Sequence, residues 1–174
     1  SRPGAGKRVQ WRHACMNFWS NLIGYQLVWF CAVIGAGHGM AWPALLALIL
    51  FAAGQWVISE NRRVDLKLLG VAVLVGLVLE SVLSYSGLVH YAAHSLALPP
   101  GGAPIWILAL WAAFSLTLRQ SLRYLQAHPW LAALLGAIGA PLAYASAARG
   151  WSAVTFGRPM WHALAAIALG WSLA

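Results

Sequence analysis

The sequence predicts an all-α, polytopic membrane protein with six transmembrane helices and with its N- and C-termini in the cytoplasm. Three observations predict this fold: an apolar composition, six apolar segments separated by helix breakers, and an uneven distribution of Lys and Arg. Of the 174 residues, 61% are hydrophobic and 8% are charged, whereas a soluble domain usually has about 25% charged residues. So few charges cannot cover a water-facing surface, and lipid is therefore the expected solvent.

The first three apolar segments run over 17–35, 40–58 and 68–88. A helix needs about 20 residues to cross the hydrocarbon core of a bilayer, and these segments are close to that length. Glycines at 35, 37 and 39 end the first segment, and the charged run 60–63 separates the second from the third. Residues 1–16 form a basic cytoplasmic segment, and because no small-x-small cleavage site follows, we expect the first helix to remain as an uncleaved anchor.

The last three segments run over 105–122, 130–148 and 160–174. The breakers before them are Pro99-Pro100-Gly101-Gly102, His128-Pro129 and Gly157-Arg158-Pro159, respectively. In the fifth segment, Gly136 and Ala140 lie four residues apart on one helix face, and such small residues let helices approach closely. Gly70 and Gly76 could do the same in the third segment. We expect residues 17–174 to form a single six-helix membrane domain.

The Lys and Arg residues predict how the chain crosses the membrane. Basic loops stay on the cytoplasmic side during insertion, and with the N-terminus inside, only Arg149 and Arg158 fall outside. This bias also accounts for the net charge of +8. We expect no nucleic-acid partner, because the sequence has no basic face interleaved with aromatic residues. The basic residues on the predicted cytoplasmic side are Arg2, Lys7, Arg8, Arg12, Arg62, Arg63, Lys67, Arg119 and Arg123.

Glu80 is an acidic residue inside the third apolar segment, in the stretch GLVLESVLSYSGLVHYAAH over 76–94. It follows Leu68, the predicted cytoplasmic end of that helix, by about 18 Å of helix. An ionisable group at that depth costs several kcal/mol unless it is paired, hydrated or neutral. We therefore expect Glu80 to be either the catalytic acid or base of a functional site or a member of a buried polar pair. Ser84, one turn later, could share its hydrogen bonds.

Glu80 is the only carboxylate predicted for the outer half of the membrane domain, whereas basic side chains and imidazoles are plentiful there. Such a set suits an anionic headgroup or a carboxylate ligand, because both accept charge-assisted hydrogen bonds. We predict a polar outer-half site in which substrate is bound by Tyr144, Arg149, Arg158, His38, His90, His94 and His162.

The histidines leave a metal site open as an alternative to a site without a cofactor. His90 and His94 have i,i+4 spacing, which would place both rings on one face of a helix. Glu80 or His38 would add a third ligand for zinc or non-haem iron, although Glu80 would reach His90 only if the chain bends near Gly87. For nucleophilic catalysis, the sequence contains no G-x-S-x-G, HExxH or Ser-His-Asp set.

Four stretches carry a resemblance to known proteins: NFWSNLIGYQLVWFCAVIGAGHGMAWP, GLVLESVLSYSGL, APIWILALWAAFSLTLRQSLRYL and LLGAIGAPLAYASAARG. In these stretches the chain resembles a group of small bacterial inner-membrane proteins catalogued as a domain of unknown function. The resemblance implies a polytopic protein without an assigned activity. Members are often encoded near enzymes resembling cyclopropane-fatty-acid synthases, which implies lipid metabolism. Glu80-Ser81 matches an acidic residue followed by Ser, the stretch 144–149 matches an aromatic-to-arginine pattern, and Arg119-Gln120 departs from a common Asn-His.

Three functions are compatible with these observations. The first is a lipid-handling enzyme or accessory factor of the bacterial inner membrane, with membrane lipids as partners and Glu80 in its site. The second is a structural subunit of a larger membrane complex, in which Glu80 pairs with Arg149 or Tyr144. The third is a small-solute or proton-coupled transporter. If the site is instead dry, with Glu80 hydrogen-bonded only to protein groups, the lipid-handling function is to be dropped.

Overall fold

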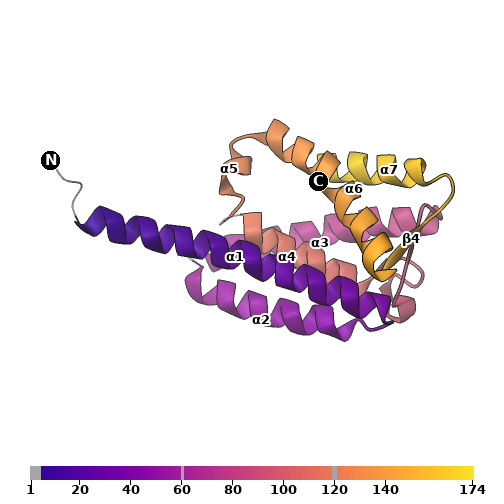
Figure 1. The fold of residues 1–174 in the computed structure, drawn as a ribbon, viewed down its shortest axis with the longest axis horizontal. Coiled ribbons are helices and arrows are strands. Elements are labelled where there is room, and N and C mark those ends of the chain that lie inside the picture. Colours follow the sequence, from indigo (N-terminus) through magenta and orange to yellow (C-terminus); the bar gives the residue numbers. More distant parts are fainter. Residues whose placement is uncertain (1–4, 60, 119–120) are drawn as a thin grey trace.

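The computed structural model describes residues 5–59, 61–118 and 121–174, with side chains from Phe18 onward except that of Arg123. The basic side chains predicted for 1–16 and the departure at Arg119-Gln120 lie outside the described part. Helices make up most of the described chain (Figure 1). They are α1 (Ala5–Gly37), α2 (Trp42–Ile58), α3 (Arg62–Tyr85), α4 (Ile105–Leu118), α5 (Arg123–Gln126), α6 (Pro129–Trp151) and α7 (Met160–Leu173).

The helix ends follow from the residues that flank them. Gly39 has a positive φ of 75°, and the Met40 N–H donates to the Gly35 carbonyl at 2.8 Å, which is the hydrogen bond of a Schellman C-cap. At the start of α3, the Asn61 side chain accepts a hydrogen bond from the Val64 N–H at 3.3 Å. Such caps satisfy backbone groups that a helix leaves unpaired at its ends. The bounds of the helices show that each of the six predicted apolar segments corresponds to one helix: α1, α2, α3, α4, α6 and α7.

Three of the described helices are long and apolar enough to cross a membrane. They are the stretch Phe18–Gly37 of α1, α3 and α6, whereas α2, α4 and α7 are shorter apolar helices. The 14 residues of α4 extend only about 21 Å, less than the roughly 30 Å of a hydrocarbon core. The helical character predicted from the sequence is confirmed, together with three membrane-spanning candidates.

Short β-strands join the helices at one end of the bundle. Strand β1 (Val89–Tyr91) pairs antiparallel with β4 (Val154–Phe156), and β2 (Ala97–Leu98) pairs antiparallel with β3 (Ala103–Pro104). A 3₁₀ turn, η1 (His94–Leu96), lies between β1 and β2. The metal alternative required a helix over His90 and His94, and this condition is not met, because His90 is in a strand and His94 begins the turn.

The helices form a bundle with a loosely attached pair on one side (Figure 1). Helices α1, α2 and α4 pack against one another and α3 packs against α4, whereas α6 packs mainly against α7. Buried apolar side chains concentrate at the end where β1 and β4 lie, and include Val89, Trp106, Tyr144 and Val154. The α6–α7 pair is thus anchored at the strand end, which we call the outer end from the predicted orientation.

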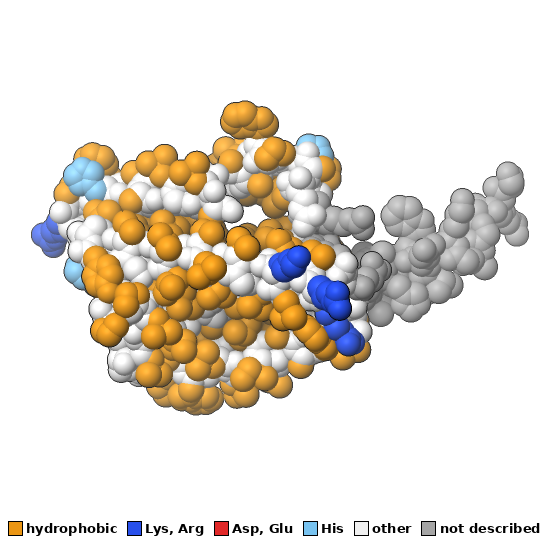
Figure 2. All heavy atoms as spheres, turned by 180° about the vertical axis from the view of Figure 1, so that it is seen from behind, with side chains coloured by type: hydrophobic (Ala, Val, Ile, Leu, Met, Phe, Trp, Pro, Cys, Tyr) orange, Lys and Arg blue, Asp and Glu red, His pale blue; other side chains and the backbone are white. Residues whose placement is uncertain are grey.

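The surface of the bundle is largely apolar (Figure 2). Large side chains along α2, α3 and α6 are exposed to what surrounds the protein, for example Val57 at 79%, Val78 at 65% and Leu142 at 63%. Exposed apolar area of this extent is unfavourable in water. Figure 2 also shows several Lys and Arg side chains gathered at the end of the bundle opposite the outer end.

Candidate functional site

Glu80 lies fully buried at the centre of a cluster of hydrogen-bond donors. The Tyr91 hydroxyl donates to Glu80 Oε2, and the Tyr144 hydroxyl donates to Oε1. Oε1 also accepts a hydrogen bond from Trp111 Nε1 at 2.9 Å. The exposed fraction of Glu80 is 0%, so these donors replace the water that the carboxyl group would otherwise bind. We call Glu80, Tyr91, Trp111 and Tyr144 the Glu80 cluster.

Four segments of the chain bring the cluster together: α3 carries Glu80, β1 carries Tyr91, α4 carries Trp111 and α6 carries Tyr144. Gly76 precedes Glu80 by one helical turn on the same face of α3. A Cβ atom at Gly76 would lie 2.4 Å from Trp111 Cγ, so only glycine leaves room for the indole there. The predicted close packing at Gly76 is therefore confirmed, whereas a Cβ atom at Gly70 would meet no described atom within 4 Å.

Tyr91 connects the Glu80 cluster to the strands of the outer end. Burial, and secondly the neighbouring Glu80 carboxyl, raise the pKa of Tyr91 above its ordinary value. The phenol therefore stays protonated and remains a donor at physiological pH. On its other side, the Tyr91 ring stacks on the half-buried His94 with 6.5 Å between ring centroids.

The structure places one predicted binding residue, Tyr144, in contact with Glu80. The pairing of Glu80 with Tyr144 considered for a structural subunit is thus confirmed, and the Glu80 carboxyl contacts no cation among the residues that the structure describes. Ser84 does not share its hydrogen bonds, because its Oγ donates to the Gly101 carbonyl at 2.8 Å.

The remaining predicted binding residues lie around the outer end without converging on Glu80. His38, His90, His162, Arg149 and Arg158 are exposed, and His94 is half-buried. Over the described ranges 5–59, 61–118 and 121–174, no three His, Cys, Asp or Glu side chains lie together as metal ligands would. Binding of an anionic headgroup by these side chains stays a prediction.

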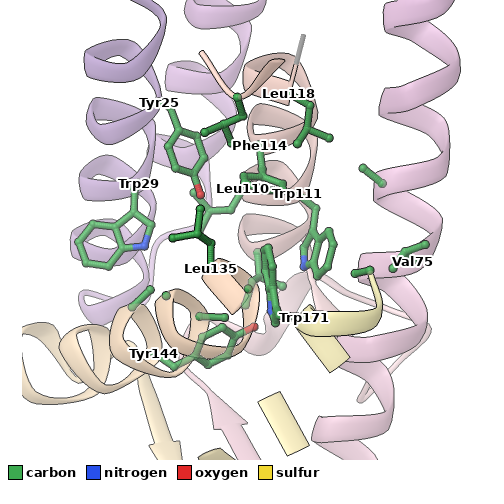
Figure 3. A pocket seen from close by; sticks show the side chains of 18 of the residues that line it. Tyr25, Trp29, Val75, Leu110, Trp111, Phe114, Leu118, Leu135, Tyr144 and Trp171 are labelled. Carbon is green, nitrogen blue, oxygen red and sulfur yellow. The ribbon is translucent and has the colours of Figure 1, made fainter. Parts of the chain in front are cut away.

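A cavity of about 990 Å³ opens beside the Glu80 cluster, between the α6–α7 pair and helices α1, α3 and α4. Its volume lies in the range of ligand-binding pockets. Figure 3 shows aromatic rings from several helices around it. Tyr25 on α1 lies beside Phe114 on α4, with 6.1 Å between ring centroids. Tyr144 and Trp111 belong to both the wall of this cavity and the Glu80 cluster.

The cavity exists because α6 presents small residues to the bundle. Most of the α6 residues that line it are small, with Leu135, Leu142 and Tyr144 among the large ones, and small side chains leave space that larger ones would fill. At Gly136 the small residue serves packing, since a Cβ would lie 2.3 Å from the Trp171 carbonyl oxygen of α7, whereas a Cβ at Gly139 would meet no described atom within 4 Å. The small lining residues of α6 are Ala132, Ala133, Gly136, Gly139, Ala140, Ala143, Ser146 and Ala147.

The wall of the cavity is mainly apolar and uncharged, with Gln26, Gln126, Ser146 and Ser172 among its polar side chains. Among the described residues that line it there is no Asp, Glu, Lys, Arg or His. Trp171 stacks on Trp111 with 4.1 Å between ring centroids, and its buried Nε1 has no hydrogen-bond partner in the described part of the chain. Figure 3 shows Tyr144 pointing towards Trp171, and the two side chains interact, although Nε1 does not meet the hydroxyl oxygen with the geometry of a full hydrogen bond.

Comparison with known proteins shows the family to which this chain belongs. The family described as Protein of unknown function (DUF2878) matches residues 18–174, which include every described helix from α2 onward and the apolar part of α1. The chain belongs to this family. The match confirms the resemblance to a domain of unknown function, and it contains both the Glu80 cluster and the cavity. The chain matches no curated protein and no solved structure.

Within this DUF2878 chain, the sequence interpretation missed Tyr91 and Trp111 as partners of Glu80. Trp111 stands in the middle of an apolar segment, where packing or lipid contact is the usual reason for a tryptophan. The signal that could have found it is the i,i+4 pair Gly76 and Glu80, because a glycine beside a buried carboxyl leaves room for a large donor. Tyr91 lies in strand β1, shortly after α3. It is held beside Glu80 by the pairing of β1 with residues 154–156, which are distant in the sequence, and no local sequence pattern predicts that pairing.

Proposed function

We propose that this protein handles lipid in the bacterial inner membrane, as an enzyme or accessory factor, by holding an acyl chain in the cavity beside the Glu80 cluster. One observation carries the proposal: a cavity of about 990 Å³ whose described lining is mainly apolar and aromatic and has no charged side chain. The proposal includes six membrane crossings with both termini cytoplasmic, supported by the Lys and Arg bias and by the apolar surface.

The dimensions of the cavity suit an acyl chain. Its wall follows α6 from Ala132 to Ala147, which is about 22 Å of helix. One leaflet of a bilayer contributes about half of the roughly 30 Å hydrocarbon thickness, so a chain from a membrane lipid fits along this wall. Transfer of such a chain from the bilayer would exchange one apolar surrounding for another, and the aromatic rings would supply close packing.

In this proposal Glu80 acts through its partners. Its carboxyl group is buried and does not line the cavity, whereas the Tyr144 and Trp111 side chains do. Glu80 is therefore a positioning residue that fixes the two rings in the cavity wall. Among the described residues only protein donors reach the Glu80 carboxyl oxygens, so the lipid-handling function in which Glu80 itself touches the ligand is dropped. The proposal rests instead on the separate cavity, which Glu80 does not line.

A cavity-filling substitution tests the proposal. The full chain, purified from membranes and washed extensively in detergent, is analysed by mass spectrometry for retained lipid per protein. We expect about one acyl lipid per chain, and Gly139→Leu should reduce it because the new side chain occupies the cavity. Gly70→Leu is the matched control, since Gly70 is an exposed helical glycine outside the cavity. Equal lipid retention in both variants, or none in the unaltered protein, would contradict the proposal.

A structural subunit of a membrane complex is the second candidate. The observation that favours it is the Glu80 carboxyl itself, which is buried and bonded to three protein donors as in a purely structural cluster. Native gel electrophoresis of mildly solubilised membranes distinguishes the lipid-handling function from the structural-subunit function. A large complex that dissociates in Glu80→Gln, with no retained lipid, would support the structural role.

A further inference from the structure

We propose that the cavity binds an uncharged lipid whose ester or amide carbonyl accepts a hydrogen bond from Trp171 Nε1. This inference rests on the proposed function and specifies its ligand. It assigns the polar end of the ligand to the part of the cavity next to the Glu80 cluster, and the hydrocarbon tail to the part between α6 and the aromatic side chains of α1 and α4.

The unpartnered indole N–H is the first observation. Trp171 Nε1 is buried and has no partner in the described part of the chain, although Trp171 lines the cavity. A buried donor without a partner costs free energy, and buried indole N–H groups usually find an acceptor. An acceptor carried by the ligand would satisfy it.

The neighbouring hydroxyl cannot take the place of this donor. The Tyr144 hydroxyl lies beside Trp171 (Figure 3), but its hydrogen is donated to Glu80 Oε1. The Trp111 N–H is also donated to Glu80. Of these three groups, Trp171 Nε1 alone makes no hydrogen bond of good geometry. It lies beside the Tyr144 hydroxyl oxygen (Figure 3), and a ligand carbonyl that reaches it replaces this poorly aligned contact with a hydrogen bond.

The absence of charge in the lining selects the class of acceptor. A carboxylate or phosphate moved into an apolar cavity needs a cationic partner, and none of the described lining residues is Lys, Arg or His. A carbonyl oxygen of an ester or amide is neutral and needs one donor. The geometry therefore favours an esterified or amidated acyl chain over a free fatty acid.

The test compares two probes that differ in the acceptor. Tritiated methyl palmitate and tritiated hexadecane are titrated against the full chain purified in amphipol, with Trp171→Phe and the control Trp161→Phe, whose ring is 63% exposed on the same helix. Trp171→Phe should weaken methyl palmitate binding by about 2- to 12-fold, the equivalent of one neutral hydrogen bond, beyond any change in hexadecane binding. Trp161→Phe should alter neither.

The outcomes separate this inference from the proposed function. If both probes bind and Trp171→Phe weakens both equally, the hydrogen bond is absent and the inference is wrong, while the acyl-chain cavity stands. If neither probe binds the unaltered protein, the proposed function fails.

A measurement without a variant covers the case in which Trp171→Phe does not fold. Infrared spectra of methyl palmitate labelled with ¹³C at the carbonyl should show a lower stretching frequency when bound than in hexadecane solution. An unshifted band would overturn the assignment to Trp171.

Discussion

Replacing Glu80 with leucine should destabilise the protein strongly, and removing two of its partners as well should restore part of the loss. Glu80→Leu leaves Tyr91, Trp111 and Tyr144 as buried donors without an acceptor. Each such donor costs about 1–3 kcal/mol, so the three together cost about 3–9 kcal/mol. That is a large share of the roughly 5–15 kcal/mol by which a typical native protein is stable.

The compensated variant carries Glu80→Leu together with Tyr91→Phe and Tyr144→Phe. Replacing both partners of a buried hydrogen bond by apolar groups of similar shape is nearly neutral. Only the Trp111 N–H then stays without an acceptor, which leaves a cost of about 1–3 kcal/mol. The triple variant should therefore be more stable than Glu80→Leu alone, although it carries more substitutions.

Thermal unfolding of the solubilised protein, followed by fluorescence-detected size-exclusion chromatography, measures both effects. For a chain of this size 1 kcal/mol shifts Tm by about 2–4 °C, so Glu80→Leu should lower Tm by at least about 6 °C. Equal Tm values for Glu80→Leu and the triple variant would refute the reasoning. So would a Glu80→Leu variant as stable as the unaltered protein, because the three donors would then have found other partners.

Two glycine substitutions test the packing around the cluster and the cavity. Gly76→Ala should lower Tm because its Cβ would lie 2.4 Å from Trp111 Cγ, and overpacking of this kind costs about 1–3 kcal/mol; Gly70→Ala, with open space around it, should be neutral or slightly stabilising, and equal effects of the two would contradict the assigned contact. Gly136→Ala should likewise lower Tm, because the contact at 2.3 Å is with the backbone oxygen of Trp171 and α7 must move. The control Gly139→Ala meets no described atom within 4 Å, and a loss of stability there as large as at Gly136 would count against the α6–α7 interface.

The helices could be predicted from the sequence because membrane helices depend on local properties. Segment length, hydropathy and breakers are all short-range, and the predicted segment 130–148 differs from α6 by only a few residues at each end. The position of Glu80 inside α3 could also be predicted, because it depends only on the length and hydropathy of the segment around it. The number of membrane crossings is less local, since α4 and α7 are short and their depth depends on what they pack against.

The partners of Glu80 could not be predicted with the same success. Because a carboxyl group attracts cations, the sequence interpretation assigned Arg149 and the histidines as partners of Glu80. These side chains instead lie around the outer end, exposed or half-buried. The donors are instead two phenols and an indole, which are amphipathic and occur in membrane helices for other reasons. The cavity was also missed, because an empty space depends on how α6 and α7 dock on the bundle.

The spacing of the Glu80 contacts along the chain has a consequence for biosynthesis. Counted in residues from Glu80, Tyr91 comes 11 later, Trp111 comes 31 later and Tyr144 comes 64 later. During synthesis the carboxyl group therefore gains its donors one after another, and the last arrives only with α6. A nascent chain that ends after α4 therefore has the carboxyl group with two of its three donors, and the last hydrogen bond forms only when α6 packs on the bundle.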